Sequence, residues 1–209
     1  MMEYLNDPEA IYRASFAAIR EAVDLSPVPE HLQPLVIRLV HACGRPEIVP
    51  ALKWSGDPVG AAQAALKQGA HIFVDATMVG AGIMRAKLPA ANDVVCTLSD
   101  DRAYEAAKRN NTTRSAAAVE FWLPSLAGAI VAIGNAPTAL FRLLELLQMP
   151  DTPRPAAILG FPVGFIGAAE SKDALVAADM GVPYVTLTGR EGGSALAAAA
   201  VNAILQGAG

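Results

Sequence analysis

The chain has little cysteine and few aromatic or charged residues, and each shortage excludes a class of protein. Its 209 residues include two cysteines, 6% aromatic residues and 17% charged residues. Cys43 and Cys96 are too few for a disulfide framework or a cysteine-rich metal cluster, so we expect reduced thiols and a cytoplasmic protein. A formal net charge of −4 disfavours nucleic acid as the partner.

Long apolar runs and a secretory leader are also missing. The most apolar stretches, residues 126–133 and 155–169, are too short, or too interrupted by glycine and proline, for the roughly 20 residues that a bilayer requires. The first ten residues, MMEYLNDPEA, are acidic and polar, unlike a secretory signal. We therefore expect no membrane segment and no export.

Small apolar residues are what the chain has in excess. Hydrophobic residues make up 53% of it, with 42 alanines and 17 glycines, and the mean hydropathy is +0.35. Such a sequence is too apolar for disorder, and its length suits a single domain over residues 1–209. Because so apolar a chain with so few charges has to cover part of its surface, we predict a homodimer or a larger assembly.

The hydrophobic pattern predicts an α/β fold. Two N-terminal helices are expected at residues 8–23 and 32–42, separated by the SPVPE segment, and after them strand-like and helix-like segments alternate. The expected strands are residues 70–75, 94–97, 129–133, 156–160 and 184–188, and the expected later helices are residues 59–68, 103–109, 115–123, a helix ending near 148, 171–178 and 194–206. Continuous apolar strands separated by helices indicate a doubly wound, mainly parallel sheet with helices on both faces.

Four loops that follow expected strands are the places to look for a ligand, because ligands of open parallel sheets bind beyond the carboxyl ends of the strands. They are residues 76–85, 134–138, 161–167 and 189–194. Two of them run into helix N-termini, whose free N–H groups favour a carboxylate or phosphate, although all four are also compatible with plain capped turns. The Gly80-Ala81-Gly82 sequence lacks the third glycine of a dinucleotide fingerprint, which disfavours a nucleotide-binding oxidoreductase.

One histidine and one arginine stand out by their neighbours. His41 follows Arg38 by one helical turn on the same face, and a neighbouring cation lowers the pKa of an imidazole and keeps it ready to give or take a proton. Arg114 lies near a helix N-terminus, the unfavourable end for a cation unless it faces an anion. A structural histidine and a solvated arginine remain the alternatives.

Six stretches of the chain resemble one family. They are IYRASFAAIR, RLVHACG, NNTTRSAAA, AIVAIGNAPTALF, AAILGFPVGFIGAAESKDAL and GREGGSA, and they extend from Tyr12 to beyond Ser194. They are similar to precorrin-8X methylmutases, which are called cobalt-precorrin-8 methylmutases in the cobalt-dependent pathway. The resemblance implies an isomerase of cobalamin biosynthesis, which belongs to porphyrin and corrin metabolism. Such an enzyme moves a methyl group from ring carbon 11 to carbon 12 and gives hydrogenobyrinate or cobyrinate.

The resemblance also implies roles for particular residues. His41 matches the catalytic histidine, Ser15 and Arg38 match substrate-contacting positions, and Arg114 and Asn135 fall in blocks that line the site. It further implies a polycarboxylate tetrapyrrole substrate, no cofactor or protein-bound metal, and a homodimer with the site at the subunit interface. A non-catalytic tetrapyrrole carrier and a cobalt-chelating relative of the same pathway are the alternatives.

Overall fold

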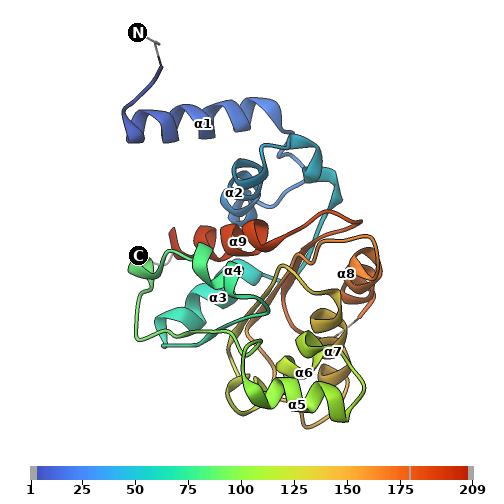
Figure 1. The fold of residues 1–209 in the computed structure, drawn as a ribbon. Helices are drawn as coiled ribbons and strands as arrows, with labels where there is room; N and C mark the ends of the chain where they lie inside the picture. The colour runs from blue at the N-terminus through green and yellow to red at the C-terminus, as the bar shows by residue number, and fades with distance from the viewer. Residues whose placement is uncertain (1–3, 179, 207–209) are drawn as a thin grey trace.

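A computed structural model describes residues 4–178 and 180–206, and in this part of the chain a single sheet forms the centre of the molecule (Figure 1). The strand order is β1-β6-β5-β4-β2-β3. Five of the strands run parallel, namely β2 (Ile72–Val74), β3 (Val94–Val95), β4 (Ile130–Ile133), β5 (Ala157–Gly160) and β6 (Tyr184–Leu187). The predicted α/β fold with a mainly parallel sheet is confirmed.

Helices cover both faces of the sheet, which explains why its central strands are apolar at every position. One face packs against α2 (Gln33–Cys43), α3 (Pro58–Lys67), α4 (Thr77–Gly82) and α9 (Ser194–Gln206). The other packs against α6 (Arg114–Glu120), α7 (Pro137–Leu147) and α8 (Ala168–Ala177), and α5 (Asp101–Arg109) lies against α6. Along β4, for example, Ile130 faces the first layer and Val131 the second.

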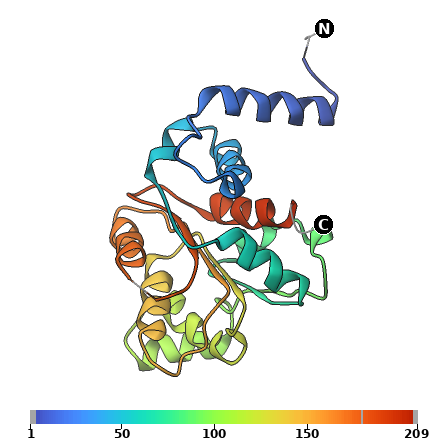
Figure 2. The ribbon, with the colours of Figure 1, turned by 180° about the vertical axis from the view of Figure 1, so that it is seen from behind.

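The first helix, α1 (Pro8–Ala22), stands apart from these layers. Asp7 caps its start by accepting a hydrogen bond from the backbone N–H of Glu9. None of its residues is buried, and it packs across α2, away from the sheet (Figure 2). One side of α1 therefore faces solvent, and Ile11 is 45% exposed there.

Two elements escaped prediction. Strand β1 (Leu52–Ser55) pairs antiparallel with β6, but only its first residue, Leu52, is buried, so it lacks the run of buried residues found in β2, β4, β5 and β6. Helix α4 contains two glycines, which are poor helix formers, and it exists because it packs against α9. Short 3₁₀ turns complete the chain at Glu30–Leu32, Pro46–Ala51, Arg85–Lys87 and Leu123–Ser125.

Across the described residues, the structure holds no helix with the length and apolarity needed to span a bilayer.

Gly134 allows the end of β4 to approach the start of α9. A Cβ atom at this position would lie 2.8 Å from the Cβ of Ala197 and 2.8 Å from the Cα of Ser194. We expect Gly134→Ala to lower the free energy of unfolding by about 1–3 kcal/mol, because the added methyl forces the two segments apart. Gly80→Ala is the matched control: its Cβ meets neighbours at 3.4 Å or more inside a helix, where alanine is favoured over glycine. Urea unfolding of both variants checks the pair, and equal midpoints would contradict the steric explanation.

Candidate active site

The centre of the candidate site is a hydrogen bond between the first two helices. Ser15 Oγ on α1 lies 2.9 Å from His41 Nδ1 in the last turn of α2. The rings of Phe16 and Tyr12 flank the imidazole, with centroids 5.1 and 5.8 Å from its own. His41 is on the surface of the chain, and because Nδ1 is bonded to the serine, Nε2 is the nitrogen left to meet a ligand.

Arg38 is buried one turn before His41 and has no carboxylate within ion-pairing distance among the described residues. Its guanidinium donates a hydrogen bond to the Tyr12 hydroxyl and lies 3.9 Å from Met84 Sδ. Gln206 Nε2, at the end of α9, donates to the same hydroxyl at 2.9 Å. The positive charge of Arg38 is therefore held in place by neutral groups and is available to an anion.

The pKa of His41 is lowered from its ordinary value. Partial burial has the larger effect, because it disfavours the charged imidazolium, and the nearby Arg38 cation adds to it. The sequence predicted the direction from Arg38, and the structure confirms that direction while giving burial the greater part. The imidazole is thus mostly neutral at pH 7 and able to accept or, once protonated, to return a proton.

His41 and Arg38 border a hollow of about 430 Å³. One wall belongs to α9 and to the end of α4, and most of its side chains are small. The lining residues are Tyr12, Arg38, His41, Ala42, Gly82, Met84, Ala195, Ala198, Ala199 and Asn202. A second hollow of about 270 Å³ lies on the side of Ser15 and also reaches His41. The imidazole therefore stands between two open spaces.

Asn202 fixes one wall of the larger hollow, and sequence reasoning missed it. Its side chain is buried, accepts a hydrogen bond from the Met84 N–H and donates one to the Gly82 carbonyl, both at 2.8 Å. The signal was an asparagine in the otherwise apolar segment SALAAAAVNAIL. Tyr12 was missed as well, although it precedes Ser15 by three residues and so shares a helix face with it.

Arg114 and Asn135 form a separate group. Arg114 is exposed at the start of α6 and lines a hollow of about 350 Å³ together with Tyr104, Ala107, Lys108, Asn111 and Thr112. Thr113 and Thr138 join their hydroxyls at 2.8 Å, which places the start of α6 beside the loop that holds the exposed Asn135. Within one chain α2 and α6 cover opposite faces of the sheet, so Arg114 is not brought to His41.

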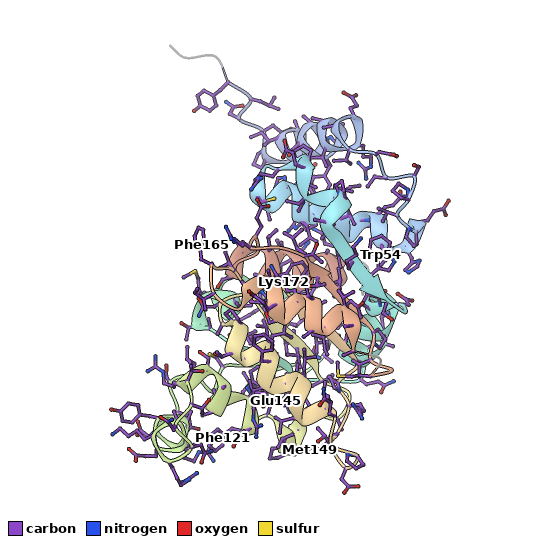
Figure 3. The ribbon with its side chains drawn as sticks, turned by 90° about the vertical axis from the view of Figure 1, so that its right-hand side faces the viewer. Trp54, Phe121, Glu145, Met149, Phe165 and Lys172 are labelled. Atoms are coloured by element: carbon purple, nitrogen blue, oxygen red, sulfur yellow. The ribbon has the colours of Figure 1, made fainter. Side chains whose placement is uncertain are left out.

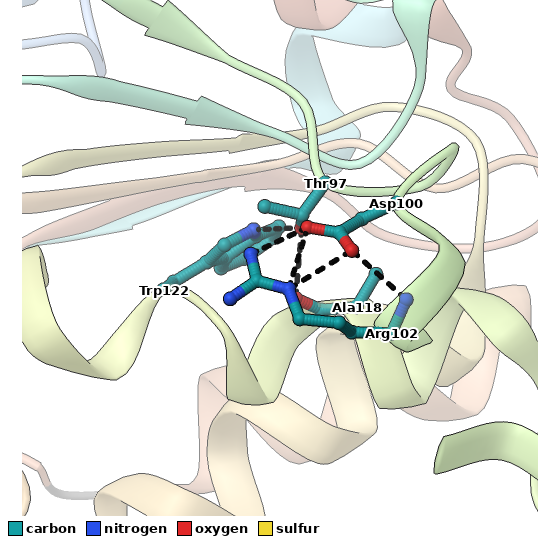
Figure 4. A network of polar contacts seen from close by, with 5 residues as sticks. All are labelled: Thr97, Asp100, Arg102, Ala118 and Trp122. Atoms are coloured by element: carbon teal, nitrogen blue, oxygen red, sulfur yellow. Dashed lines mark hydrogen bonds and ion pairs between the residues drawn. The ribbon is translucent and has the colours of Figure 1, made fainter. Parts of the chain in front are cut away.

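The position of α6 is fixed from the segment that follows β3 (Figure 4). Thr97 Oγ1 donates to the Ala118 carbonyl at 2.8 Å and accepts from the Trp122 ring N–H at 2.9 Å. Asp100 caps α5 and pairs with Arg102, which lowers the pKa of this carboxyl to about 2. These contacts hold α5 and α6, which contribute the residues that line the hollow beside Arg114.

Asp75 binds the N–H groups before α7, one of the two helix N-termini at which a ligand carboxylate or phosphate was expected. Its buried carboxylate follows β2 and accepts hydrogen bonds from the N–H groups of Gly134, Asn135 and Ala136 at 2.8, 2.9 and 2.6 Å. Burial raises its pKa, and these three bonds oppose the rise. The free N–H groups before α7 are thus used by the chain itself, and the buried strand sequence AHIFVD ending in an aspartate was the missed signal.

In the described part of the chain, no three histidine, cysteine, aspartate or glutamate side chains lie together as a possible metal site.

The fold and the site define a doubly wound α/β protein with a histidine–serine pair suited to proton transfer. Comparison with known proteins then gives the family. The sequence model of the family described as precorrin-8X methylmutase matches residues 10–207. A precorrin-8X methylmutase of Pseudomonas aeruginosa is 52% identical over 204 residues, which cover 98% of each chain.

More distant relatives agree. A cobalt-precorrin-8 methylmutase of Priestia megaterium is 35% identical, over 94% of this chain and 87% of its own. A solved precorrin-8X methylmutase structure from Thermus thermophilus superposes with a TM-score of 0.86 at 36% identity and covers 96% of both chains. The chain belongs to the precorrin-8X methylmutase family. It is an enzyme, an isomerase of cobalamin biosynthesis, and the resemblance in its motifs is confirmed.

We expect Asp75→Asn to lower the free energy of unfolding by about 2 kcal/mol, because an amide cannot accept the three hydrogen bonds that the carboxylate takes. Asp93→Asn is the control, since the Asp93 side chain is 75% exposed. Urea unfolding measures both variants. If Asp75→Asn unfolds at the same urea concentration as Asp93→Asn, the carboxylate does not hold the loop.

Proposed function

We propose that the chain moves the methyl group of precorrin-8X, or of its cobalt-loaded form, from ring carbon 11 to ring carbon 12, to give hydrogenobyrinate or cobyrinate. The observation that carries the proposal is the Ser15–His41 hydrogen bond at the edge of a hollow that also contains the Arg38 charge, which pairs with no carboxylate of residues 4–178 or 180–206. The reaction conserves all atoms, because the bond from the methyl group to carbon 11 breaks as the bond to carbon 12 forms.

In this proposal His41 lends a proton or a hydrogen bond to a ring nitrogen while the methyl group moves and takes the proton back afterwards, so substrate and product carry the same number of protons. A group that protonates or hydrogen-bonds a ring nitrogen withdraws electron density and eases the migration of the methyl group. Ser15 can donate to Nδ1 or accept from it, so either tautomer of the imidazole is held in the same orientation. His41 can therefore present Nε2 as a donor in one tautomer and as an acceptor in the other.

Substrate binding is proposed to depend on the charge of Arg38 and on the flat wall that α9 gives to the hollow. The rim of the macrocycle carries acetate and propionate carboxylates, for which a guanidinium is a suitable partner, and Arg38 is the cation of this cavity. A flat pigment also needs an unobstructed surface, and Ala195, Ala198 and Ala199 of α9 offer one. Substrate contact is thus proposed for Arg38 and Ser15 on one side and for the α9 wall on the other.

A second subunit is proposed to complete the site. Arg114 lines a hollow that shares no residue with the one beside His41, and α6 and α2 cover opposite faces of the sheet. Arg114, with Asn135 on the neighbouring loop, therefore reaches the same macrocycle most simply from a partner chain. The helix that carries Ser15 has no buried residue, and Ile11 together with Leu5 leaves apolar surface on that side uncovered. We therefore propose a homodimer in which each site combines His41 of one chain with Arg114 and Asn135 of the other.

The first test replaces the histidine. His41→Ala should fold, bind the pigment and lose methyl transfer by about 10²–10⁴-fold, the usual contribution of general acid–base catalysis. His31→Ala is the matched control, because His31 is also exposed but lies against Asp57 away from the hollow. Absorption spectroscopy follows the reaction, since the conjugation of the pigment changes on isomerisation. Turnover near that of the unmodified protein in His41→Ala would remove the proposed role.

The same assay distinguishes the two substrates. This chain is 52% identical to a relative named for precorrin-8X and 35% identical to one named for cobalt-precorrin-8, which favours the metal-free pigment. We expect faster turnover of metal-free than of cobalt-loaded substrate, measured in parallel at equal concentration.

The shared site is tested by mixing two inactive variants. If His41 and Arg114 of different chains serve one site, a heterodimer of His41→Ala and Arg114→Ala chains contains one intact site. Statistical mixing then restores about a quarter of the unmodified activity, because half of the dimers are mixed and each has one of two sites intact. Light scattering supplies the mass of the assembly. A monomeric mass at micromolar concentration, or no recovery on mixing, contradicts a site shared between subunits.

A further inference from the structure

A buried lysine lies beneath the loop that leads into α9. Lys172 on α8 is fully buried, and its ammonium donates a hydrogen bond to the backbone carbonyl of Glu191. Figure 3 places Lys172 toward the centre of the molecule, whereas Phe165 lies at its edge. An ammonium is costly to bury, and no carboxylate lies within ion-pairing distance of this one among the described residues, so packing alone does not explain a lysine here.

The loop above Lys172, residues 189–193, is fastened on several sides. Gly193 donates its N–H to the Phe161 carbonyl at 2.7 Å, and the Arg190 carbonyl accepts from Gly164 at 3.1 Å. A Cβ atom at Gly192 would lie 2.3 Å from the Phe161 carbonyl oxygen. The backbone of this loop is therefore in direct contact with the backbone of the loop that follows β5. The Lys172 hydrogen bond holds the same loop from the side of α8.

This loop is connected to both walls of the candidate site. Its last residue leads directly into α9, which contributes Ala195, Ala198 and Asn202 to the hollow beside His41. In the other direction the Glu191 carboxylate pairs with Arg45, four residues after His41 and just beyond the end of α2. Glu191 is thereby connected both to the segment that follows the helix holding the imidazole and to the helix that faces it.

We propose that Lys172 is a positioning residue for the isomerase: through the Glu191 carbonyl it fixes residues 189–193, and so sets the α9 wall of the hollow relative to His41. This inference rests on the proposed function only for its activity readout. Lys172 touches neither His41 nor the hollow, so it acts through the loop alone.

The charges around Lys172 make its action depend on pH. Burial lowers its pKa to about 8, while the carboxylates of Asp173 and Glu191 oppose this effect. The remaining charged groups on the neighbouring segments have other partners or are exposed. Arg190 lies over the Phe165 ring, and Arg45 pairs with Glu191. On the α7 side Arg142 pairs with Glu120 and Glu145, and Glu170 of α8 is exposed. A neutral amine is a weaker donor than an ammonium, so the loop is held less firmly above this pKa.

The test uses amide hydrogen exchange of the unmodified protein between about pH 6 and about pH 10. After correction for the intrinsic rate, the Gly193 and Gly164 amides should lose about tenfold or more of their protection above about pH 8, because a charge-assisted hydrogen bond is roughly twice as strong as a neutral one. The Ile158 amide, which donates within the sheet, should keep its protection and serves as the reference. Constant protection through this range removes the pH dependence, and equal protection of Gly193 and Gly164 in Lys172→Met and in the unmodified protein at pH 7 overturns the proposal.

Activity supplies the second arm. We expect the unmodified enzyme to lose kcat above about pH 8, and Lys172→Met to be about 10- to 100-fold slower at pH 7 with this basic limb absent, as a small misplacement of a site permits. Asp173→Asn should move the limb to lower pH, since it removes a carboxylate that favours the ammonium. A Lys172→Met enzyme with the unmodified pH profile overturns the proposal. Failure of the unmodified protein to isomerise the pigment would instead refute the proposed function and leave the exchange result to decide the role of Lys172.

Discussion

The contact between α1 and α2 is the interaction on which the candidate site depends. Helix α1 contributes no fully buried residue, and its hydrophobic contact with the core is made by partly buried side chains such as Ile19. Two polar contacts fix its rotation: Ser15 with His41, and the Tyr12 hydroxyl with Arg38. The groups proposed for catalysis and for anion binding are therefore also the groups that hold α1 against α2.

The fold was largely predictable because its signals are local. Apolar strands such as residues 129–133 and the helix at residues 194–206 were recognised from the hydrophobic pattern, and their bounds agree to within a residue. The antiparallel strand β1 was not, since Leu52 is its single buried residue and its place is decided by pairing with β6. Helix α4 failed for a related reason: its glycines argue against a helix, and tertiary packing against α9 outweighs that preference.

The candidate site was predictable only in part. The spacing of Arg38 and His41 on one helix identified a pair that the structure keeps together, and the family resemblance added Ser15, which the structure places at hydrogen-bond distance from His41. The contacts of Asp75, Asn202 and Lys172 join segments far apart in the sequence, so no local pattern shows their partners. In the sequence, each of these buried polar residues appears only as a polar residue within an apolar stretch. Such a residue can mean that the stretch is not a buried helix or strand, or that its side chain hydrogen-bonds to a distant segment.

The hydroxyl of Tyr12 has a consequence for how this protein is handled. It accepts hydrogen bonds from Arg38 and from Gln206, so a phenol in the first helix joins the last turn of α9 to the cavity. Shortening α9 by one turn would take away one of the two donors that orient the ring beside His41. Expression designs for this enzyme should therefore retain that last turn and separate any affinity tag from it with a flexible spacer.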